Sequence, residues 1–301
     1  MRTVAGSGRR TWGWYTMVRA NDAPFGMTAG ARSKARAALK ARPRGLFADL
    51  DGTLSAIAAA PEAAVLLPDV RGLLEQARGA FDVVAIVSGR AVQEAQAMTG
   101  VRGLTYIGNH GLESLETDAS SRGRVGSGRR VHPAALPYVR AIDEALVTIK
   151  GRLGRRYPGI WIEPKGVTGS IHLRSTAFPD EAANAIYELA HQLAAGSGLR
   201  VTRGKLVIEL RPPVDVDKGV AIAQIVHAKG LRGAMYLGDD QTDLDAFRAL
   251  RRLERAGDCA GLAVAVSSPE APAELATEAD LALPTVEEVP AFLRWLLSSA
   301  T

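Results

Sequence analysis

The sequence has little of what marks a secreted, membrane-spanning or redox-active protein. Its 301 residues include one cysteine, Cys259, which excludes an internal disulfide, a cysteine-only metal site and a CxxC redox centre. No uncharged apolar run reaches the roughly 18 residues that a transmembrane helix needs, so we expect no membrane partner. These absences indicate a protein of the reducing cytoplasm.

The composition also lacks the bias of a disordered chain. Hydrophobic residues make up 47 % of the sequence and charged residues 23 %, which is an ordinary globular balance. The length is sufficient for one large domain or for two modest ones that share a core.

Acidic residues are almost absent from the first part of the chain. Residues 1–44 contain ten lysine and arginine residues against one acidic residue, Asp22, although the net charge of the whole chain is only +5. We expect residues 1–44 to be a basic, disordered leader that is not a secretory signal, because it lacks an apolar segment. The alternative is that the leader binds an anionic polymer through phosphate contacts. Since residues 45–301 carry 27 basic and 31 acidic residues, we expect no nucleic-acid partner for the folded part.

Short apolar runs alternate with helical patterns from Gly45 onward. This alternation is typical of an α/β protein with a doubly wound, mostly parallel sheet. Strands are expected at residues 46–48, 83–87, 104–107, 235–237 and 262–266, and helices through residues 70–77 and 244–253.

The middle of the chain departs from this pattern, because it predicts a helix, two strands, a second helix and two further strands. Such an order is typical of an α+β unit inserted into a larger fold. The helices are expected near residues 136–153 and 180–195, and the strands at 160–163, 170–174, 199–202 and 205–210, after a Gly/Ser/Arg-rich connection at 120–130. We therefore divide the folded chain into a catalytic core of residues 45–115 and 213–301 and an inserted α+β cap domain of residues 116–212.

Two carboxylates follow the first expected strand. Residues 49–54 read DLDGTL, and ligands of open α/β sheets bind beyond the carboxyl ends of the strands. Asp49 and Asp51 can therefore reach one small site, and a carboxylate nucleophile beside an acid–base carboxyl is suited to covalent phosphoryl transfer. The alternative is a turn cluster that caps the next helix.

Three further elements present polar residues in comparable places. Ser88 begins an SGR sequence after the second strand and offers a hydroxyl to phosphate oxygens, unless it only caps a helix. Lys218 opens a helix, where it either neutralises a phosphate or is a solvated first-turn residue. Residues 238–243 read GDDQTD, and oxygen ligands at this density suit a hard cation such as Mg²⁺, although an acidic first turn also complements a helix dipole.

These four elements in this order resemble the haloacid dehalogenase (HAD) superfamily of phosphohydrolases. The resemblance extends over most of residues 46–266. It implies a HAD-like core in which Asp49 is the nucleophile that becomes an aspartyl phosphate and Asp51 is the general acid and base. Ser88 and Lys218 would then hold the phosphoryl group.

The same resemblance implies Mg²⁺ as the cofactor. Its ligands would be Asp49, the backbone carbonyl of Asp51, and Asp239, with Asp243 supporting the metal site. The five histidines have no spacing typical of a metal site.

Further motifs resemble the trehalose-6-phosphate phosphatases within this superfamily. They are residues 108–113 (GNHGLE), 163–166 (EPKG) with Ser170, His172 and Arg174, 204–205 (GK) with 209–212 (ELRP), and 238–247 (GDDQTDLDAF). Leu244 departs from the family, whose members usually have glutamate there, and the loop 55–61 is also unlike theirs. By this resemblance, the substrate-binding residues are Arg90, Asn109, His110, Glu163, Lys165, Ser170, His172, Arg174, Lys205 and Glu209.

Strand periodicity gives an independent reason to expect a binding face on the insertion. Alternate residues of a strand lie on the same face, so Ser170, His172 and Arg174 oppose Ile171 and Leu173. The inserted sheet therefore has an apolar face for its own helices and a polar face. That polar face is either a solvated surface or a lid over a phosphate-bearing sugar.

The resemblance therefore implies a Mg²⁺-dependent phosphatase that hydrolyses trehalose 6-phosphate to trehalose and phosphate. We also expect the protein to be a monomer. Alternative substrates for the same chemistry are sucrose 6-phosphate and mannosyl-3-phosphoglycerate. An alternative of another class is a non-catalytic binding protein. The presence of a suitable residue at every expected catalytic position argues against it.

Overall fold

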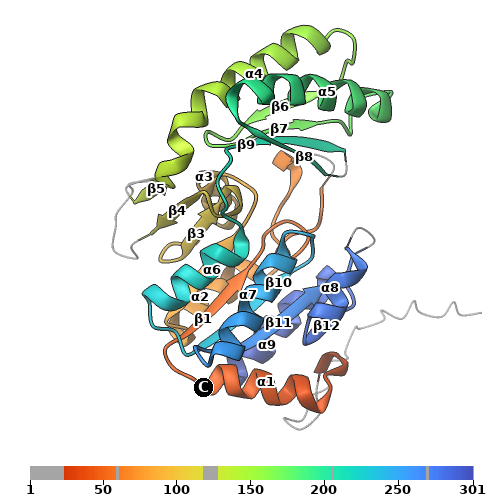
Figure 1. Cartoon of the computed structure of the whole chain (residues 1–301). Helices are drawn as coiled ribbons and strands as arrows, with labels where there is room; N and C mark the ends of the chain where they lie inside the picture. The colour runs from red at the N-terminus through yellow and green to blue at the C-terminus, as the bar shows by residue number, and fades with distance from the viewer. Residues whose placement is uncertain (1–23, 59–60, 118–127, 205, 269–270, 301) are drawn as a thin grey trace, which may run out of the picture.

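Two sheets organise the computed structural model, which describes residues 24–58, 61–117, 128–204, 206–268 and 271–300 (Figure 1). The strand order of the large sheet is β12-β11-β10-β1-β2-β3-β4-β5. Neighbouring strands from β12 to β3 are parallel, and the β3–β4 and β4–β5 pairs are antiparallel. The predicted mostly parallel α/β fold is confirmed.

The central strands of the large sheet are apolar along most of their length because helices cover both of its faces. Every residue is buried in β1 (Arg44–Ala48), β2 (Val83–Val87) and β10 (Gly233–Gly238). The other strands of this sheet are β3 (Thr105–Gly108), β4 (Glu113–Glu116), β5 (Arg129–Val131), β11 (Ala260–Val266) and β12 (Leu281–Leu283).

The helices that cover the large sheet form two layers, one on each of its faces. Because side chains alternate along a strand, Leu46 and Ala48 of β1 join one core cluster and Phe47 joins the other. The first cluster includes α1 (Ala29–Lys40), α2 (Val70–Ala80), α3 (Val92–Thr99) and α9 (Val289–Ala300), and the second includes α6 (Lys218–Ala228), α7 (Asp243–Ala256) and α8 (Ala273–Glu278). Within the described residues, no helix combines the length and apolarity needed to cross a membrane.

The smaller sheet has its helices on one face only. Its strands, in the order β6-β7-β9-β8, are β6 (Trp161–Pro164), β7 (Gly169–His172), β9 (Val207–Arg211) and β8 (Arg200–Gly204). Ile171 and Ile208 pack with α4 (Val139–Leu153) and α5 (Pro179–Ser197) in a separate core. In Figure 1 these helices lie on the outer side, and the strands lie toward the large sheet.

Helix α5 begins and ends where its local chemistry predicts. Pro179 occupies the first turn, where its missing N–H is not needed, and Asp180 and Glu181 complement the positive end of the helix dipole. Gly198 ends the helix with a φ of 72°, which glycine adopts without a steric penalty.

The inserted unit begins later than the expected residue 116. β4 and β5 continue the large sheet past that residue, with Glu113 opposite Val131. Residues 120–127 of the expected connection lie outside the described residues, and Arg129–Val131 is a strand rather than a loop. β4 is stabilised by pairing with β3, and β5 by pairing with β4, rather than by an apolar pattern of their own.

Helix α1 contradicts the expectation that all of residues 1–44 form a disordered leader. Thr28 caps its first turn by accepting a hydrogen bond from the backbone N–H of Ala31 at 3.1 Å. One side of the helix is buried in the core that it shares with β10 and β11, through Ala31, Ala35, Ala38 and Leu39. Residues 1–23 lie outside the described part of the chain.

The sequence signal for α1 is weak because its buried stripe consists mainly of alanine between basic residues. Alanine nevertheless has the strongest intrinsic helix preference. The helix also packs closely on the sheet, because Gly233 of β10 has no β-carbon; one there would lie 2.1 Å from the carbonyl oxygen of Ala38. The segment therefore joins the core despite its charge.

Two neighbouring alanines of α1 allow a matched test of this packing. Ala38 is fully buried and Ala37 is exposed. We expect Ala38→Glu to reduce the free energy of unfolding by at least about 3 kcal/mol, because it buries an unpaired charge. Ala37→Glu should change it by no more than about 0.5 kcal/mol. Chemical denaturation monitored by circular dichroism would measure both, and equal small effects would contradict the packing of α1.

Candidate active site

The predicted site residues come together at one edge of the large sheet. β10, β1, β2 and β3 are adjacent parallel strands, so their carboxyl ends meet at this edge. Asp239, Asp49, Ser88 and Asn109 follow these four strands directly. The arrangement is the usual position of a ligand site in an open α/β sheet.

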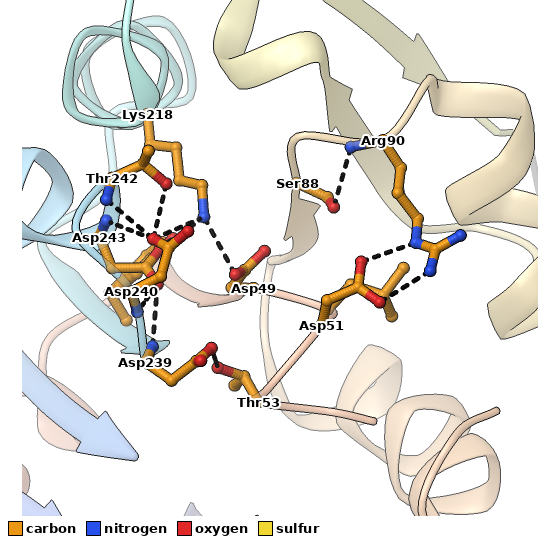
Figure 2. Close-up of polar contacts among 12 residues, drawn as sticks. Asp49, Asp51, Thr53, Ser88, Arg90, Lys218, Asp239, Asp240, Thr242 and Asp243 are labelled. Carbon is orange, nitrogen blue, oxygen red and sulfur yellow. Dashed lines mark hydrogen bonds and ion pairs between the residues drawn. The ribbon is translucent and has the colours of Figure 1, made fainter. Parts of the chain in front are cut away.

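Asp49 and Lys218 form a buried ion pair at the centre of the site (Figure 2). The Nζ atom of Lys218 lies 3.0 Å from Oδ2 of Asp49 and 2.7 Å from Oδ1 of Asp243. Burial raises the pKa of Asp49 well above its usual value, against the opposing attraction of Lys218. Burial would lower the pKa of Lys218, but the neighbouring carboxylates, Asp240 first, raise it well above its usual value.

Asp243 acts as an acceptor for several donors in this cluster. Its Oδ2 atom accepts the backbone N–H groups of Asp239 and Asp240 at 2.8 and 3.0 Å. Its Oδ1 atom accepts from Lys218 and from the hydroxyl group of Tyr236. Asp243 therefore holds the loop after β10 and the Lys218 ammonium in one arrangement.

Asp239 lies against the turn that follows Asp49. Thr53 donates a hydrogen bond from its hydroxyl to Oδ1 of Asp239 at 2.9 Å. Gly52 has a φ of 84°, and a β-carbon there would lie 2.0 Å from Oδ2 of Asp239. Only glycine therefore permits this close approach.

The carboxylates of Asp49, Asp239 and Asp243 fit a metal ion. One oxygen of each lies within 4.8 Å of the others, and all three residues are buried. Burial, with the charges of Asp243 and Asp240, raises the pKa of Asp239 to about 8, and a cation bound there would favour its ionised form. Oxygen-only donors suit a hard divalent ion.

Asp51 is paired with the arginine of the SGR sequence. Nε and Nη2 of Arg90 donate to the two carboxylate oxygens at 2.6 and 2.8 Å, which is a bidentate contact. The Asp51 side chain is 37 % exposed, in contrast to the buried Asp49. Ser88 is buried, and its Oγ atom accepts the backbone N–H of Arg90 at 3.2 Å.

A cavity of about 1020 Å³ joins this edge to the polar face of the small sheet. The expected catalytic and metal residues that line it are Asp49, Asp51, Ser88, Lys218 and Asp239. The expected substrate residues that line it are Arg90, His110, Glu163, Lys165, Ser170, His172, Arg174 and Glu209. Lys205 lies outside the described residues.

Asn109 does not line this cavity, contrary to the expected substrate contact. Its side chain is buried and donates to Glu113 at 2.8 Å and to the backbone carbonyl of Lys165 at 3.1 Å. It also accepts the hydroxyl hydrogen of Thr168 at 2.6 Å. Asn109 therefore joins the end of β3 to the small unit, and its hydrogen-bonding groups are used there.

Polar residues of the small sheet are held in place by one another and by the large sheet. Glu163 is 2.8 Å from Nε2 of His172 and 3.5 Å from Nζ of Lys165. Burial opposes ionisation of Glu163, but the hydrogen bond from His172 and the charge of Lys165 lower its pKa below the usual value. Lys165 also donates to the backbone carbonyl of Gly89 at 3.2 Å, beside Ser88.

His110 brings a second contact between the two sheets. Its Nε2 atom lies 3.7 Å from Oε2 of Glu209 on β9. The residue has a φ of 57°, a conformation that few side chains adopt. Burial lowers the pKa of His110 from 6.5 to about 4, despite the attraction of Glu209.

The sequence reasoning missed several residues of the site. Thr53 and Tyr236 orient Asp239 and Asp243, and no local pattern indicates those distant partners. Trp161 and Arg211 also line the cavity. Arg211 lies in the ELRP motif that the resemblance includes, whereas Trp161 was missed. It lies two residues from Glu163, and the period of two along a strand was a signal that could have found it.

A parallel sheet with a DxD sequence after β1, a serine and a lysine beside it, and an inserted unit over the strand ends are typical of the phosphohydrolases of the HAD superfamily. A profile of the family described as trehalose-phosphatase matches residues 47–286. The chain belongs to this family.

Curated relatives agree with that assignment. The chain is 34 % identical over 221 residues to a trehalose-phosphate phosphatase of Mycobacterium marinum, a match that covers 69 % of this chain and 54 % of the relative. It is also 34 % identical over 226 residues to an uncharacterized glycosyl hydrolase of Mycobacterium tuberculosis, covering 73 % of this chain and 16 % of that protein. The match thus spans about half, or less, of the length of these relatives.

Solved structures share the fold. The C-terminal domain of Candida albicans trehalose-6-phosphate phosphatase superposes with a TM-score of 0.71 at 22 % identity, covering 90 % of this chain and 98 % of that one. The Aspergillus fumigatus trehalose-6-phosphate phosphatase superposes with a TM-score of 0.57 at 26 % identity, covering 91 % and 100 %.

The lowered pKa of His110 predicts a stability loss in mild acid. Between pH 6.5 and 4 the unfolded chain binds the imidazole proton and the folded chain does not, so lowering the pH favours unfolding in this window. We expect the Tm of wild type to fall more steeply between pH 6.5 and 4 than that of His110→Asn, since asparagine tolerates the positive φ and does not titrate. Differential scanning calorimetry across this range would measure both.

The exposed His191 of α5 supplies the matched control. His191→Asn should follow the wild-type pH profile, because that side chain lies outside the cavity. Parallel pH profiles for wild type and His110→Asn would show that His110 is not held neutral by its surroundings.

Proposed function

We propose that this chain is a Mg²⁺-dependent phosphatase that hydrolyses trehalose 6-phosphate to trehalose and phosphate through an aspartyl-phosphate intermediate. The observation that carries the proposal is the buried Asp49, which is paired with Lys218 and lines a cavity shared with the small sheet. Family membership over residues 47–286 supports the substrate. The monomeric state, the cytoplasmic location and the lack of nucleic-acid and membrane partners stay predictions.

In the first step Asp49 attacks the phosphorus atom in line with its bond to the sugar oxygen. A bond forms between a carboxylate oxygen and phosphorus, and the bond from phosphorus to the sugar oxygen breaks. Asp51 donates a proton to the departing oxygen. The bidentate contact with Arg90 sets the direction of the Asp51 carboxyl group.

In the second step a water molecule attacks the phosphorus of the aspartyl phosphate. Asp51 accepts a proton from that water, the bond from phosphorus to Asp49 breaks, and inorganic phosphate leaves. Ser88 and Lys218 would hold the non-reacting oxygens with a hydroxyl donor and an ammonium donor. Because both lie at fixed, buried positions, they need little rearrangement during the reaction.

Asp49, Asp239 and the backbone carbonyl of Asp51 would hold the Mg²⁺ ion. Asp243 would support them, because it accepts hydrogen bonds from Lys218 and from the backbone N–H of Asp239 and so holds both in place. When bound, the ion neutralises negative charge on the phosphate oxygens.

The small unit would act as the cap that recognises the sugar. Glu163 and Glu209 can accept hydrogen bonds from sugar hydroxyl groups, and Lys165 can donate to phosphate or hydroxyl oxygens. Asn109 contributes indirectly by holding the cap against β3. A role for Lys205 stays a prediction.

Phosphate release from a panel of sugar phosphates tests the proposal. The full chain with Mg²⁺ should show its highest kcat/KM on trehalose 6-phosphate, compared with sucrose 6-phosphate, mannosyl-3-phosphoglycerate and glucose 6-phosphate. Preference for another member of the panel would contradict the substrate and retain the chemistry. No release from any of them would favour the non-catalytic alternative.

Replacement of the nucleophile provides a sharper test. Asp49→Asn should lower kcat by a factor on the order of 10⁴ or more, because an amide does not attack phosphorus. The surface change Asp258→Asn is the control and should retain wild-type activity. Substantial turnover by pure, folded Asp49→Asn protein would exclude the aspartyl-phosphate mechanism.

Removal of metal should stop the reaction reversibly. We expect EDTA to abolish activity, Mg²⁺ to restore it and Ca²⁺ to restore it poorly, because Ca²⁺ prefers more ligands at longer distances than Mg²⁺. Phosphate release after exhaustive chelation and metal addition measures this. Full activity in the chelator would refute the metal assignment.

A further inference from the structure

Trp161 is a large apolar side chain that remains 37 % exposed while lining the cavity. It is the first residue of β6, on the small sheet. None of the catalytic steps uses it. An indole that faces a polar cavity suggests a ligand with an apolar surface of its own.

The register of the small sheet places Trp161 in a distinct row of side chains. Cross-strand pairing aligns one row across the four strands: Trp161, His172, Val207 and Gly204. A second row, two residues further along β6, aligns Glu163, Ser170, Glu209 and Thr202. All eight residues line the cavity, and the rows lie about 7 Å apart.

The polar row is the nearer of the two to the phosphate chemistry. Two residues beyond Glu163, Lys165 donates to the carbonyl of Gly89, beside Ser88. Trp161 lies two residues in the opposite direction along the strand. A substrate whose phosphate lies between Ser88 and Lys218 therefore meets the carboxylates first and the indole beyond them.

The Trp161 ring is supported from one side. It lies against the His172 ring with centroids 4.7 Å apart and planes inclined at 34°. His172 is itself held by Glu163 at 2.8 Å. The indole therefore has a fixed neighbour, which reduces the conformational entropy lost when a ligand covers it.

We propose that Trp161 is the stacking surface for the sugar ring farther from the phosphate and selects a disaccharide phosphate over a monosaccharide phosphate. A pyranose ring has an apolar C–H face and a hydroxyl edge. The indole would cover the face, and the adjacent polar row would accept hydrogen bonds from the edge. This inference rests on the proposed function, since it assumes a sugar phosphate at Asp49.

Kinetics on two substrates test the stacking surface. Trp161→Ala should raise KM for trehalose 6-phosphate by about tenfold and change kcat by less than about threefold. It should leave KM for glucose 6-phosphate unchanged, because that substrate has no second ring. Trp161→Phe should restore most of the affinity, which a loss of cap structure would not allow.

Phe178→Ala is the matched control. Phe178 is an exposed aromatic residue of the same unit, 66 % accessible and outside the cavity. It should show wild-type KM on both substrates. An equal rise in KM for both substrates in Trp161→Ala, or no rise for trehalose 6-phosphate, would overturn the role of Trp161.

A binding measurement separates this inference from the proposed function. In Asp49→Asn protein, trehalose 6-phosphate should change the tryptophan fluorescence, and the added change Trp161→Phe should remove that response. Trp295→Phe, on α9 and outside the cavity, should retain it. Wild-type hydrolysis of trehalose 6-phosphate without a Trp161-dependent response would refute the inference alone, whereas neither hydrolysis nor binding of trehalose 6-phosphate would refute both.

Discussion

The site depends above all on the buried ammonium group of Lys218. Its contacts with Asp49 and Asp243 place one positive charge among carboxylates that have almost no access to water. Burying charges in this way costs free energy unless each has a partner, and removal of one partner leaves the others uncompensated. Lys218 begins α6, Asp49 follows β1 and Asp243 begins α7. These ion pairs therefore also fix the positions of three elements relative to one another.

The backbone near these charges is as constrained as the side chains. Gly52 lets the turn after Asp49 lie against Asp239. At the end of β3, a β-carbon on Gly108 would lie 2.7 Å from backbone atoms of Arg90 and Val92, so glycine lets the loops after β2 and β3 approach one another. Close approach of the main chain at the strand ends therefore brings residues of the large sheet and of the small sheet to one cavity.

The two units meet through polar contacts. Asn109 and Lys165 supply hydrogen bonds between them, and the apolar cluster at the junction is small, with Leu112, Ala135, Val167 and Val216 as its buried members. Each unit has its own larger core. Under the proposed function, the large sheet would hold the phosphate chemistry while the face of the small sheet would determine which sugar is bound.

The sequence by itself determined the order of most strands and helices and placed Asp49, Ser88 and Asp239 at one edge, whereas Lys218 joined them only through the family resemblance. The first two results follow from local spacing, because apolar runs mark buried strands and the carboxyl ends of parallel strands meet. Only the tertiary structure decided that α1 joins the core, that Arg90 contacts Asp51, that Asn109 is used within the cap junction and that Trp161 lies beside His172. These contacts join residues distant in the chain or on separate strands, and they form only when packing brings complementary surfaces together, so no local pattern specifies them.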